Sequence, residues 1–526
     1  MRAILTIVCW ITSFILTAQS GFIWPCASRT ITGNYGELRP NHFHAGLDLA
    51  TNQQHLPVVA VADGYISRVR YNATGYGRCV YITHANGKTT VYAHLETYND
   101  SLLHYVRQLQ FALKKNEIDT VLPEKKWLVK SGQLIGFTGN SGGSSGPHLH
   151  FEIRDTKSEV PLNPARFLSY TDKTPPVITH FAFYDLQNPE VPVLLNLQKN
   201  APTTTAKVIS LSSNQIGFAF SAYDLVTKKG NKNNVCDVRL YANNELIFAW
   251  KLDSIAFEQS RYINFFSEKV GETKLQKCYT PDCYPTHIYK KQKSKGLLPL
   301  QNLQNTVLKL ECRDERGNLA VLKLTVRAEK NCNQKVAQNY GNCEERFVIK
   351  EKNCSLMLPP YSRYFLKKFY LNSPSPQKIE IAPTVTLQTP ALLALHSFDF
   401  NKKQVVLVQG DNVIAPTRIN DSIVFTLKNT GAFRIEIDTV PPKIQMAATS
   451  MQRKGIVVFT INEQRTGIKE WHAYVNGRWI PADFDPRINQ LQVPIETALL
   501  SAGCTVKVVV IDKCGNSSQL AVVIKR

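Results

Sequence analysis

The chain has 526 residues, of which 43% are hydrophobic, so it can build about three or four domains of ordinary size. This composition excludes a disordered or a collagen-like chain. The 62 Lys and Arg residues exceed the 41 Asp and Glu residues and give a net charge of +21, which favours an anionic polymer or membrane surface as a partner. The 12 Cys are too few for a small disulfide scaffold, although pairs can form in an oxidising compartment.

The N-terminus has the features of an export signal. It has one basic residue, Arg2, an apolar run over residues 3–16, and small residues at Ala18 and Ser20. We interpret residues 1–20 as a signal peptide that is cleaved after Ser20. The run is shorter than the roughly 20 residues that span a bilayer, which disfavours a membrane anchor. We therefore expect an exported protein, in the periplasm, at the cell surface or outside the cell, with no transmembrane segment in its mature chain.

Residues 21–170 have the pattern of a compact β domain. Short β-branched runs alternate with turn signals such as Asn86-Gly87 and Gly142-Gly143. Residues 101–115 differ, because their apolar residues recur at intervals of three and four, which is helical spacing. These apolar residues are Leu102, Leu103, Val106, Leu109 and Leu113. We expect one helix inserted between strands.

The rest of the chain contains a duplicated pattern. A segment with Pro175-Pro176 opens the first copy and one with Pro441-Pro442 opens the second, and both begin with Asp, at Asp172 and Asp438. The corresponding residues downstream are Tyr241, Asn243, Ile247 and Ala249 in the first copy and Tyr474, Asn476, Ile480 and Ala482 in the second. Each copy ends with the same turn, Asp314 to Asn318 and Asp512 to Asn516. Such repeats indicate duplicated modules.

Both copies place hairpin turns between alternating strands, at Asn243-Asn244 and Asn476-Gly477. We predict immunoglobulin-like β-sandwiches at residues 171–330 and 438–526, on the resemblance of the Pro-Pro entry and the final turn to small modules of bacterial exported proteins. Between them, residues 331–437 are predicted to form a β-rich domain of unnamed type.

The cysteines constrain this reading. Cys504 and Cys514 stand at opposite ends of a predicted strand, too far apart for a disulfide. Cys278 and Cys283 can pair across a Pro-containing loop, and one pair is expected among Cys332, Cys343 and Cys354. Cys79, inside an apolar strand, is expected to be a buried free thiol.

Histidines of the first domain gather in three segments, at residues 41–48, 90–95 and 146–152. Side chains alternate along a strand, so His148 and His150 point the same way while Leu149 and Phe151 face the core. His44 and Asp48 stand four residues apart, and Gly46 between them disfavours a helix.

Two neutral imidazoles and a carboxylate form a usual ligand set for catalytic Zn²⁺, with the fourth position left for water. Water bound in this way loses a proton near neutral pH and attacks a carbonyl that the metal polarises. A second pair of imidazoles can then move protons and stabilise the tetrahedral intermediate.

Three motifs resemble the signature blocks of the lysostaphin-type zinc endopeptidases, which cleave peptidoglycan peptides. They are His44-x-x-x-Asp48, Tyr92-Ala93-His94-Leu95 and His148-x-His150, within residues 32–155. Further motifs follow in family order: Pro57-Val58-Val59-Ala60, Asp63-Gly64, Gly75-Tyr76-Gly77, His84-Ala85-Asn86-Gly87 and Gly139-Asn140-Ser141-Gly142.

The resemblance implies a zinc metallopeptidase domain at residues 21–170. It implies one zinc ion held by His44, Asp48 and His150. It also implies that His148 acts as the base and that His94 stabilises the intermediate. The chain departs from the family at His55-Leu56, where a Gly commonly precedes the Pro-Val pair, and in the inserted helix, which is expected to reshape the substrate groove.

Other residues near these motifs are assigned structural roles. His42 either lines the groove or bonds to a backbone carbonyl, and we favour the second role. His84 stands near an Asn-Gly turn, and Tyr92 is expected to belong to the core. His104, His180, His287, His396 and His472 are interpreted as ordinary surface or core residues.

The fold class that follows is all-β, with a lysostaphin-type β-sheet domain, an inserted helix and downstream sandwiches. We expect an endopeptidase that acts on peptidoglycan peptides and associates with the anionic envelope surface. Nucleic acid is disfavoured because the chain is exported and has no recognised nucleic-acid motif. A binding domain that activates another wall hydrolase, or a protease for other proteins, are the alternatives.

Overall fold

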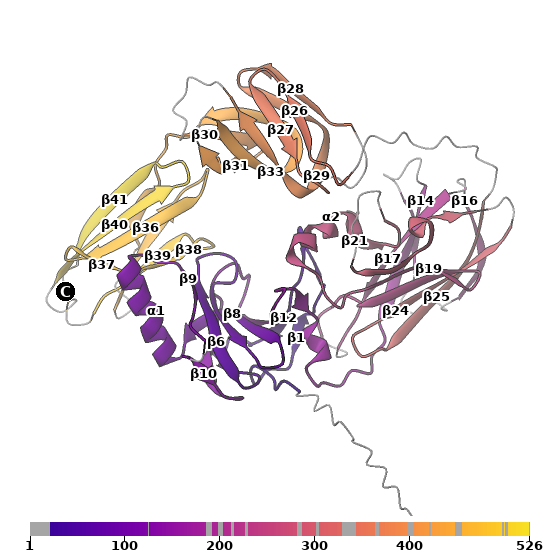
Figure 1. Ribbon diagram of the computed structural model, residues 1–526, viewed down its shortest axis with the longest axis horizontal. Coiled ribbons are helices and arrows are strands. Elements are labelled where there is room, and N and C mark those ends of the chain that lie inside the picture. The colour runs from indigo at the N-terminus through magenta and orange to yellow at the C-terminus, as the bar shows by residue number, and fades with distance from the viewer. Residues whose placement is uncertain are drawn as a thin grey trace, which may run out of the picture.

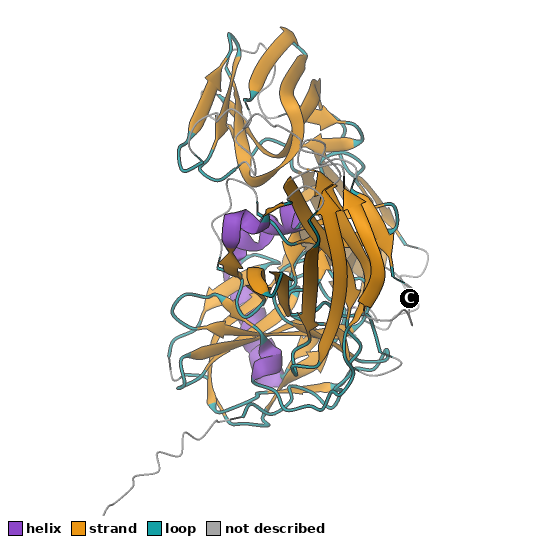
Figure 2. Ribbon diagram, turned by 90° about the vertical axis from the view of Figure 1, so that its right-hand side faces the viewer, coloured by secondary structure: helices purple, strands orange, loops and turns teal. Residues whose placement is uncertain are grey.

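The protein is described here from a computed structural model (Figure 1). It covers residues 21–524 except 125, 186–191, 198–203, 212–214, 227–229, 281–286, 301–303, 329–342, 363–367, 397–403, 420–421, 448–454, 497–498 and 500–502. Strands make up most of the described chain (Figure 2), which confirms the all-β class. The predicted signal peptide, Cys283 and Cys332 lie outside the described residues. In the described part, no helix is long and apolar enough to cross a membrane.

The first domain is built on an 11-stranded sheet, and the third strand of its main path carries the histidine pair. The main order is β1 (Ile31–Gly33), β4 (Leu47–Ala50), β12 (His148–Asp155), β8 (Lys88–Tyr98), β7 (Arg78–Thr83), β6 (Gly64–Tyr71) and β10 (Leu128–Val129). The side strands are β5 (Pro57–Val59), β9 (Ile118–Val121), β11 (Leu134–Thr138) and β13 (Pro161–Leu162). Leu149 and Phe151 are fully buried in the core, as the strand alternation predicted.

The predicted helix is present as α1 (Asp100–Leu113). Its first turn is capped by Asn99, whose side chain accepts a hydrogen bond from the backbone N–H of Leu102, and its end is marked by Lys114 in the left-handed conformation. Leu102 and Val106 are buried against the sheet. Phe111, near the end of the helix, instead contacts Trp479 of the last module, with ring centroids 6.0 Å apart.

Residues 171–328 form two packed sheets of six strands each. One contains β14 (Val177–Asp185), β15 (Val193–Asn196), β17 (Gln215–Tyr223), β20 (Ser267–Val270), β21 (Thr273–Lys277) and β23 (Leu298–Pro299). The other contains β16 (Thr204–Leu211), β18 (Asp237–Ala242), β19 (Glu245–Lys251), β22 (Tyr289–Gln292), β24 (Thr306–Arg313) and β25 (Leu319–Ala328). The short helices η2 (Phe257–Tyr262) and α2 (Ile263–Phe266) follow β19.

This second core is shared with the first domain. The hairpin of β2 (Leu38–Arg39) and β3 (His42–Phe43) follows Tyr35 and ends at Phe43. Tyr35 and Phe43 belong to the same cluster of buried residues as Trp250 and Phe266. Phe43 contacts Phe266 edge to face, with ring centroids 5.2 Å apart. No pattern in the sequence predicted that residues so close to His44 would pack into another module.

The third region is one eight-stranded sheet. Its strands are β26 (Phe347–Lys350), β27 (Cys354–Leu358), β28 (Tyr370–Ser375), β29 (Lys378–Leu395), β30 (Val405–Gln409), β31 (Asn412–Ile414), β32 (Arg418–Ile419) and β33 (Ile423–Ile437). The last region has two four-stranded sheets. One contains β34 (Lys443–Met446), β35 (Ile456–Asn462), β38 (Asp483–Asp485) and β39 (Gln490–Pro494). The other contains β36 (Ile468–Val475), β37 (Arg478–Ile480), β40 (Cys504–Asp512) and β41 (Ser517–Ile524). We propose domain boundaries after residues 170, 330 and 437, as expected from the sequence.

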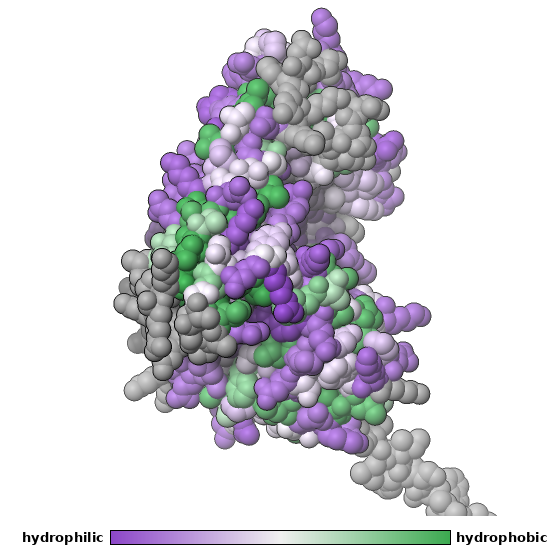
Figure 3. All heavy atoms as spheres, turned by 90° about the vertical axis from the view of Figure 1, so that its left-hand side faces the viewer, coloured by the Kyte–Doolittle hydropathy of each residue, from purple (hydrophilic) through white to green (hydrophobic). Residues whose placement is uncertain are grey.

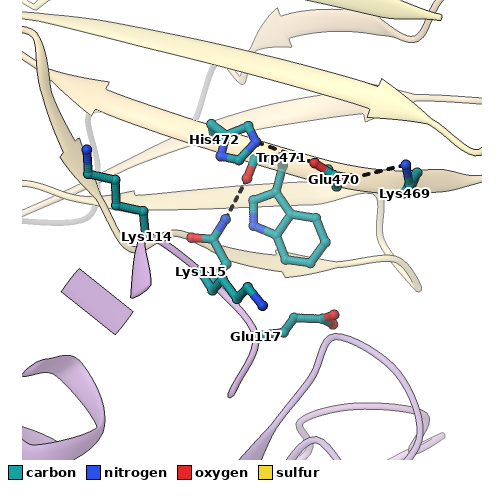
Figure 4. A pocket seen from close by; sticks show the side chains of 8 residues that line it. Lys114, Lys115, Glu117, Lys469, Glu470, Trp471 and His472 are labelled. Atoms are coloured by element: carbon teal, nitrogen blue, oxygen red, sulfur yellow. Dashed lines mark hydrogen bonds and ion pairs between the residues drawn. The ribbon is translucent and has the colours of Figure 1, made fainter. Parts of the chain in front are cut away.

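The four regions follow one another around a ring, and the last region returns to the first (Figure 1). The side-chain amide of Asn116, just after α1, donates to the Trp471 carbonyl at 2.5 Å and accepts from the Ala482 N–H at 2.8 Å. Figure 4 shows this junction, where Lys114 and Lys115 lie opposite the strand that carries Trp471. On the outer face of the last module and α1, hydrophilic and hydrophobic side chains are mixed (Figure 3).

The cysteine predictions have different outcomes. Cys79 is a buried free thiol, as expected. Cys504 and Cys514 are also free, in agreement with the prediction that they do not pair with each other. The proposed pair of Cys278 is wrong, because this residue is a free thiol with 0% exposure whose side chain packs inside the sandwich core. Cys343 is disulfide-bonded, whereas Cys354 is free.

Candidate metal centre

Three predicted ligands meet where β4 pairs with β12. Asp48 lies directly opposite His150 in the antiparallel register, and His44 lies just before β4. The three donor atoms are mutually close: His44 Nε2 is 2.9 Å from His150 Nδ1, His150 Nδ1 is 2.9 Å from Asp48 Oδ1, and His44 Nε2 is 3.1 Å from the same oxygen. All three residues are buried. The segment from His44 to Asp48 is not helical, as Gly46 indicated.

In His44 and His150, the ring nitrogen that points away from the three donor atoms is held by a hydrogen bond. Nδ1 of His44 donates to the carbonyl oxygen of Asn34 at 2.8 Å, and Nε2 of His150 donates to Oε1 of Glu152 at 2.8 Å. These bonds fix the tautomers so that the two nitrogens facing each other carry lone pairs. Two lone pairs and a carboxylate oxygen around one point are a donor set for a cation.

The charges around this point are consistent with a cation. Burial opposes ionisation of Asp48, but His44, His148 and His150 together hold its pKa well below the usual value. Burial likewise disfavours a charged His150, yet the hydrogen bonds that it donates to the carboxylates of Asp48 and Glu152 raise its pKa to about 9. A metal ion placed among these groups would take the role of that proton.

Glu152 has a supporting role that the sequence did not assign. It is fully buried, and its carboxylate also accepts hydrogen bonds from Tyr76 Oη at 2.5 Å and Arg154 Nε at 2.7 Å. Burial would raise its pKa, but Arg154 and His150 lower that pKa to about 2. The ionised carboxylate orients His150, as carboxylates commonly do behind metal-binding histidines. The alternation His-x-His-x-Glu on one strand is the signal that could have revealed it.

His94 and His148 lie beside the three ligands, with ring centroids 4.8 Å apart. Nδ1 of His94 donates to the Ser141 carbonyl at 2.8 Å, and Nδ1 of His148 donates to the Gly146 carbonyl at 2.8 Å. Nε2 of His148 lies 3.4 Å from Asp48 Oδ1 and is a buried atom without a hydrogen-bond partner among the described residues.

His94 is held in an unusual backbone conformation. Its φ is 59°, in the left-handed region that residues other than glycine rarely adopt, and it lies where the pairing of β8 with β7 is irregular. Burial, together with His150 and His148, lowers the pKa of His94 to about 3, so the ring is neutral.

The site opens into a cavity of about 490 Å³. Its lining residues are Thr32, Glu37, Arg39, Asp48, His94, Gly143, Ser144, Ser145, Gly146, Pro147 and His148. The His148 side chain is 17% exposed, so the centre is accessible to a substrate. We expected the inserted helix to reshape the substrate groove, but no residue of α1 lines this cavity. The end of α1 contacts the last module instead.

The remaining predicted residues lie outside the donor set. His42 is exposed, and its Nδ1 bonds to the Pro40 carbonyl at 2.9 Å, which agrees with a structural role. His84 bonds to Asp63 O and Thr90 Oγ1, both at 2.8 Å. Tyr92 is fully buried in the core of the first domain, as expected.

Two other modules reach the edges of the centre. Asn34, whose carbonyl holds His44, exchanges two hydrogen bonds with the backbone of Asn234 in the second region, at 2.7 and 3.0 Å. On the opposite side, Arg487 of the last region donates to the Ser144 carbonyl at 2.6 Å, four residues before His148. The sequence indicated neither contact.

Known proteins share this part of the chain. Residues 42–118 and 116–164 match peptidase family M23. The DD-carboxypeptidase/endopeptidase Mpg of Neisseria meningitidis is 33% identical over 156 residues, which are 28% of this chain and 30% of Mpg. The murein hydrolase activator NlpD of Salmonella typhimurium is 32% identical over 149 residues, 28% of this chain and 32% of NlpD.

Among solved structures, the catalytic domain of lysostaphin from Staphylococcus simulans is 26% identical and covers 26% of this chain and 87% of that domain, with a TM-score of 0.20. This chain spans about a third of the length of Mpg and of NlpD. Peptidases of family M23 use zinc, and the cluster of His44, Asp48 and His150 fits such an ion. The first domain of this chain is therefore a domain of peptidase family M23, the lysostaphin type that the sequence motifs resemble.

Proposed function

We propose that this protein is an exported zinc-dependent endopeptidase that hydrolyses peptide bonds in the cross-bridges or stem peptides of peptidoglycan. The observation that supports it best is the position of His148. Its Nε2 lies 3.4 Å from Oδ1 of the ligand Asp48 and has no hydrogen-bond partner among the described residues, while its Nδ1 is fixed by a backbone carbonyl. Such an arrangement leaves one imidazole nitrogen ready to accept a proton.

His44, Asp48 and His150 would hold the zinc ion. When bound, zinc lowers the pKa of a water molecule and polarises the carbonyl of the substrate. Because Nδ1 of His148 donates to Gly146, its Nε2 accepts the proton of the attacking water and can then pass it to the leaving nitrogen.

His94 has a different part in the reaction. Its Nδ1 donates its proton in a hydrogen bond to the Ser141 carbonyl. Its Nε2 can therefore donate only when the ring is protonated. The low pKa of about 3 disfavours that form before substrate binds. Negative charge that develops on the substrate oxygen would favour uptake of one proton from solvent by Nε2 of His94, and the resulting imidazolium would stabilise that oxygen by a charged hydrogen bond.

The relatives support peptidoglycan as the substrate, because NlpD is named as an activator of murein hydrolases and Mpg as a DD-carboxypeptidase and endopeptidase. Export through the predicted signal peptide and a net charge of +21 are consistent with an enzyme that works at the anionic bacterial envelope. We propose that the downstream modules position the first domain or bind a partner there.

Digestion of purified sacculi tests this proposal. Residues 21–526 should release peptides, and a zinc chelator should stop the release. His148→Ala should retain zinc but lose turnover by about 10²–10⁴-fold, the usual contribution of a general base. His42→Ala is the matched control, since His42 is an exposed histidine of the same domain outside the donor set. A zinc-loaded protein that leaves sacculi of every common bridge type intact would defeat the proposal.

A second candidate is a domain that does not cleave but activates another wall hydrolase, as the name of NlpD describes for that relative. The presence of all five side chains, His44, Asp48, His94, His148 and His150, favours cleavage. Two results together would support the activator. The parent protein alone would not cleave sacculi, and the His148→Ala variant would stimulate a separate hydrolase as strongly as the parent protein does. Digestion of ordinary proteins in preference to sacculi would identify a general protease.

A further inference from the structure

Two clusters of carboxylates occur at corresponding places in the second and the last region. The first contains Asp172, Asp224 and Asp314, and the second contains Asp438, Glu463 and Asp512. In each cluster, one oxygen from every member lies within 4.8 Å of the others. Both clusters lie far along the chain from the zinc ligands and contain oxygen donors alone.

Strand pairing shows that the two clusters are equivalent. Asp172 and Asp438 each stand three residues before a Pro-Pro pair. Asp224 directly follows Tyr223, which pairs with Val177 after the first Pro-Pro pair. Glu463 likewise follows Asn462, which pairs with Lys443 after the second.

The third member comes from the repeated final turn. The carboxylate of Asp314 accepts from the Asn318 backbone N–H at 2.9 Å and from Nδ2 of the same residue at 2.7 Å. Asp512 accepts from Asn516 in the same way, at 2.9 and 2.8 Å. The Asn amide also donates to the carbonyl of the linker residue, Asp172 at 3.2 Å or Asp438 at 2.9 Å. Each turn is thereby tied to the entry of its module.

Each cluster contains a buried oxygen that lacks a hydrogen-bond partner among the described residues. Oδ1 of Asp224 is such an atom in the first cluster, and Oδ2 of Asp438 is the corresponding atom in the second. The two residues are only 2% and 0% exposed. An ionised oxygen buried in this way is costly unless a positive group meets it.

Neighbouring side-chain cations are engaged elsewhere. Arg316 donates to the Ala165 and Leu168 carbonyls at 2.7 and 2.8 Å. Arg465 lies 3.9 Å from Asp438 Oδ1 but makes its short ion pair, at 2.6 Å, with Glu436. The carboxylates of the first cluster also affect one another. Burial, and then the charges of Asp314 and Asp172, raise the pKa of Asp224 to about 7.

We propose that each cluster binds one Ca²⁺ ion. Calcium takes oxygen ligands at about 2.3–2.6 Å, so two ligands of one ion lie at most about 5 Å apart, which the clusters satisfy. Zinc prefers nitrogen and sulfur donors, which separates these sites from the His-containing centre. Because Asp172 and Asp438 belong to the linkers, the ion joins each linker to the module that follows and limits rotation at the joint.

Calorimetric titration of the full chain with CaCl₂ tests the proposal. The protein is freed of other cations and loaded with one equivalent of Zn²⁺ before the titration. We expect two Ca²⁺ ions per chain, with dissociation constants between about 10⁻⁶ and 10⁻³ M. Asp224→Asn and Glu463→Gln should each lose one ion. Both changes preserve side-chain shape and remove a negative charge from a crowded cluster, so the modules should fold, which circular dichroism checks.

Glu272→Gln is the matched control, because its side chain is 97% exposed in the same module as Asp224. This variant should bind two ions. Mg²⁺ should bind at least tenfold more weakly, since it demands shorter octahedral coordination. The absence of Ca²⁺ binding at about 1 mM, or two ions bound by both cluster variants, would overturn the proposal. Equal affinity for Mg²⁺ would overturn the assignment to calcium.

Discussion

Replacement of Asn34 by Ala should destabilise both the fold and the metal centre. The Asn34 side chain is 4% exposed, and it pairs with the backbone N–H and carbonyl of Asn234, which is 6% exposed. The substitution leaves both buried backbone groups without partners, at about 1–3 kcal/mol each. We therefore expect the free energy of unfolding to fall by about 2–6 kcal/mol.

The same change should weaken zinc binding. The Asn34 backbone carbonyl that orients His44 remains in the variant, but its segment loses the side-chain bonds to Asn234 that hold it in place. Weaker support behind a metal-binding histidine commonly lowers metal affinity about 10–100-fold. The assays are denaturant unfolding of the zinc-loaded chain and competition with a chromogenic zinc chelator. In a chain of several domains, the first unfolding transition is the one to follow.

Asn231→Ala is the matched control for this experiment. Asn231 also crosses the boundary between the first two regions, where its Nδ2 donates to the Thr32 carbonyl at 3.0 Å, but this bond is exposed. Its loss should cost no more than about 1 kcal/mol and leave zinc affinity unchanged. Equal effects of the two substitutions on stability and on zinc affinity would refute the reasoning that the buried pair supports the centre.

Three further changes test other parts of the site. Glu152→Gln should lower zinc affinity by about 10–100-fold, measured by chelator competition, because the neutral amide orients His150 less strongly; unchanged affinity would exclude the role given to Glu152. His148→Ala should keep one equivalent of zinc by elemental analysis while sacculus digestion is lost, and loss of the metal would instead make His148 a ligand. Arg487→Ala should raise KM for wall peptides more than it lowers kcat, since Arg487 holds the Ser144 carbonyl in the cavity wall; a fall in kcat alone would contradict this.

The resemblance to the lysostaphin-type endopeptidases implied the ligand set of His44, Asp48 and His150. The arrangement of the histidine pair follows instead from strand alternation, which is a local rule. His148 and His150 share one face of β12, and that rule also places Leu149 and Phe151 in the core. The left-handed conformation of His94 was not predictable, because it arises where β8 pairs irregularly with β7. Pairing between strands depends on the whole sheet and not on neighbours in the sequence.

The inserted helix shows a related limit. The spacing of its apolar residues predicted α1 and the burial of Leu102 and Val106. It could not show that Phe111, 40% exposed at the end of the helix, contacts Trp479 more than 350 residues later. A wide apolar stripe on a helix indicates a second contact, but it does not identify the partner. The wrong pairing of Cys278 has the same origin, since only the packed core shows that its side chain points inward.

The cavity is therefore shaped by the assembly of modules as well as by the first domain. One wall contains Glu37 and Arg39, from the segment whose Tyr35 and Phe43 pack into the second core. The opposite wall contains Ser144, which Arg487 of the last region holds. Residues 21–170 alone would keep the zinc ligands and His148 but would lose both supports. Under the proposed function, substrate choice should thus depend on the junctions between modules, while the chemistry remains with the five central side chains.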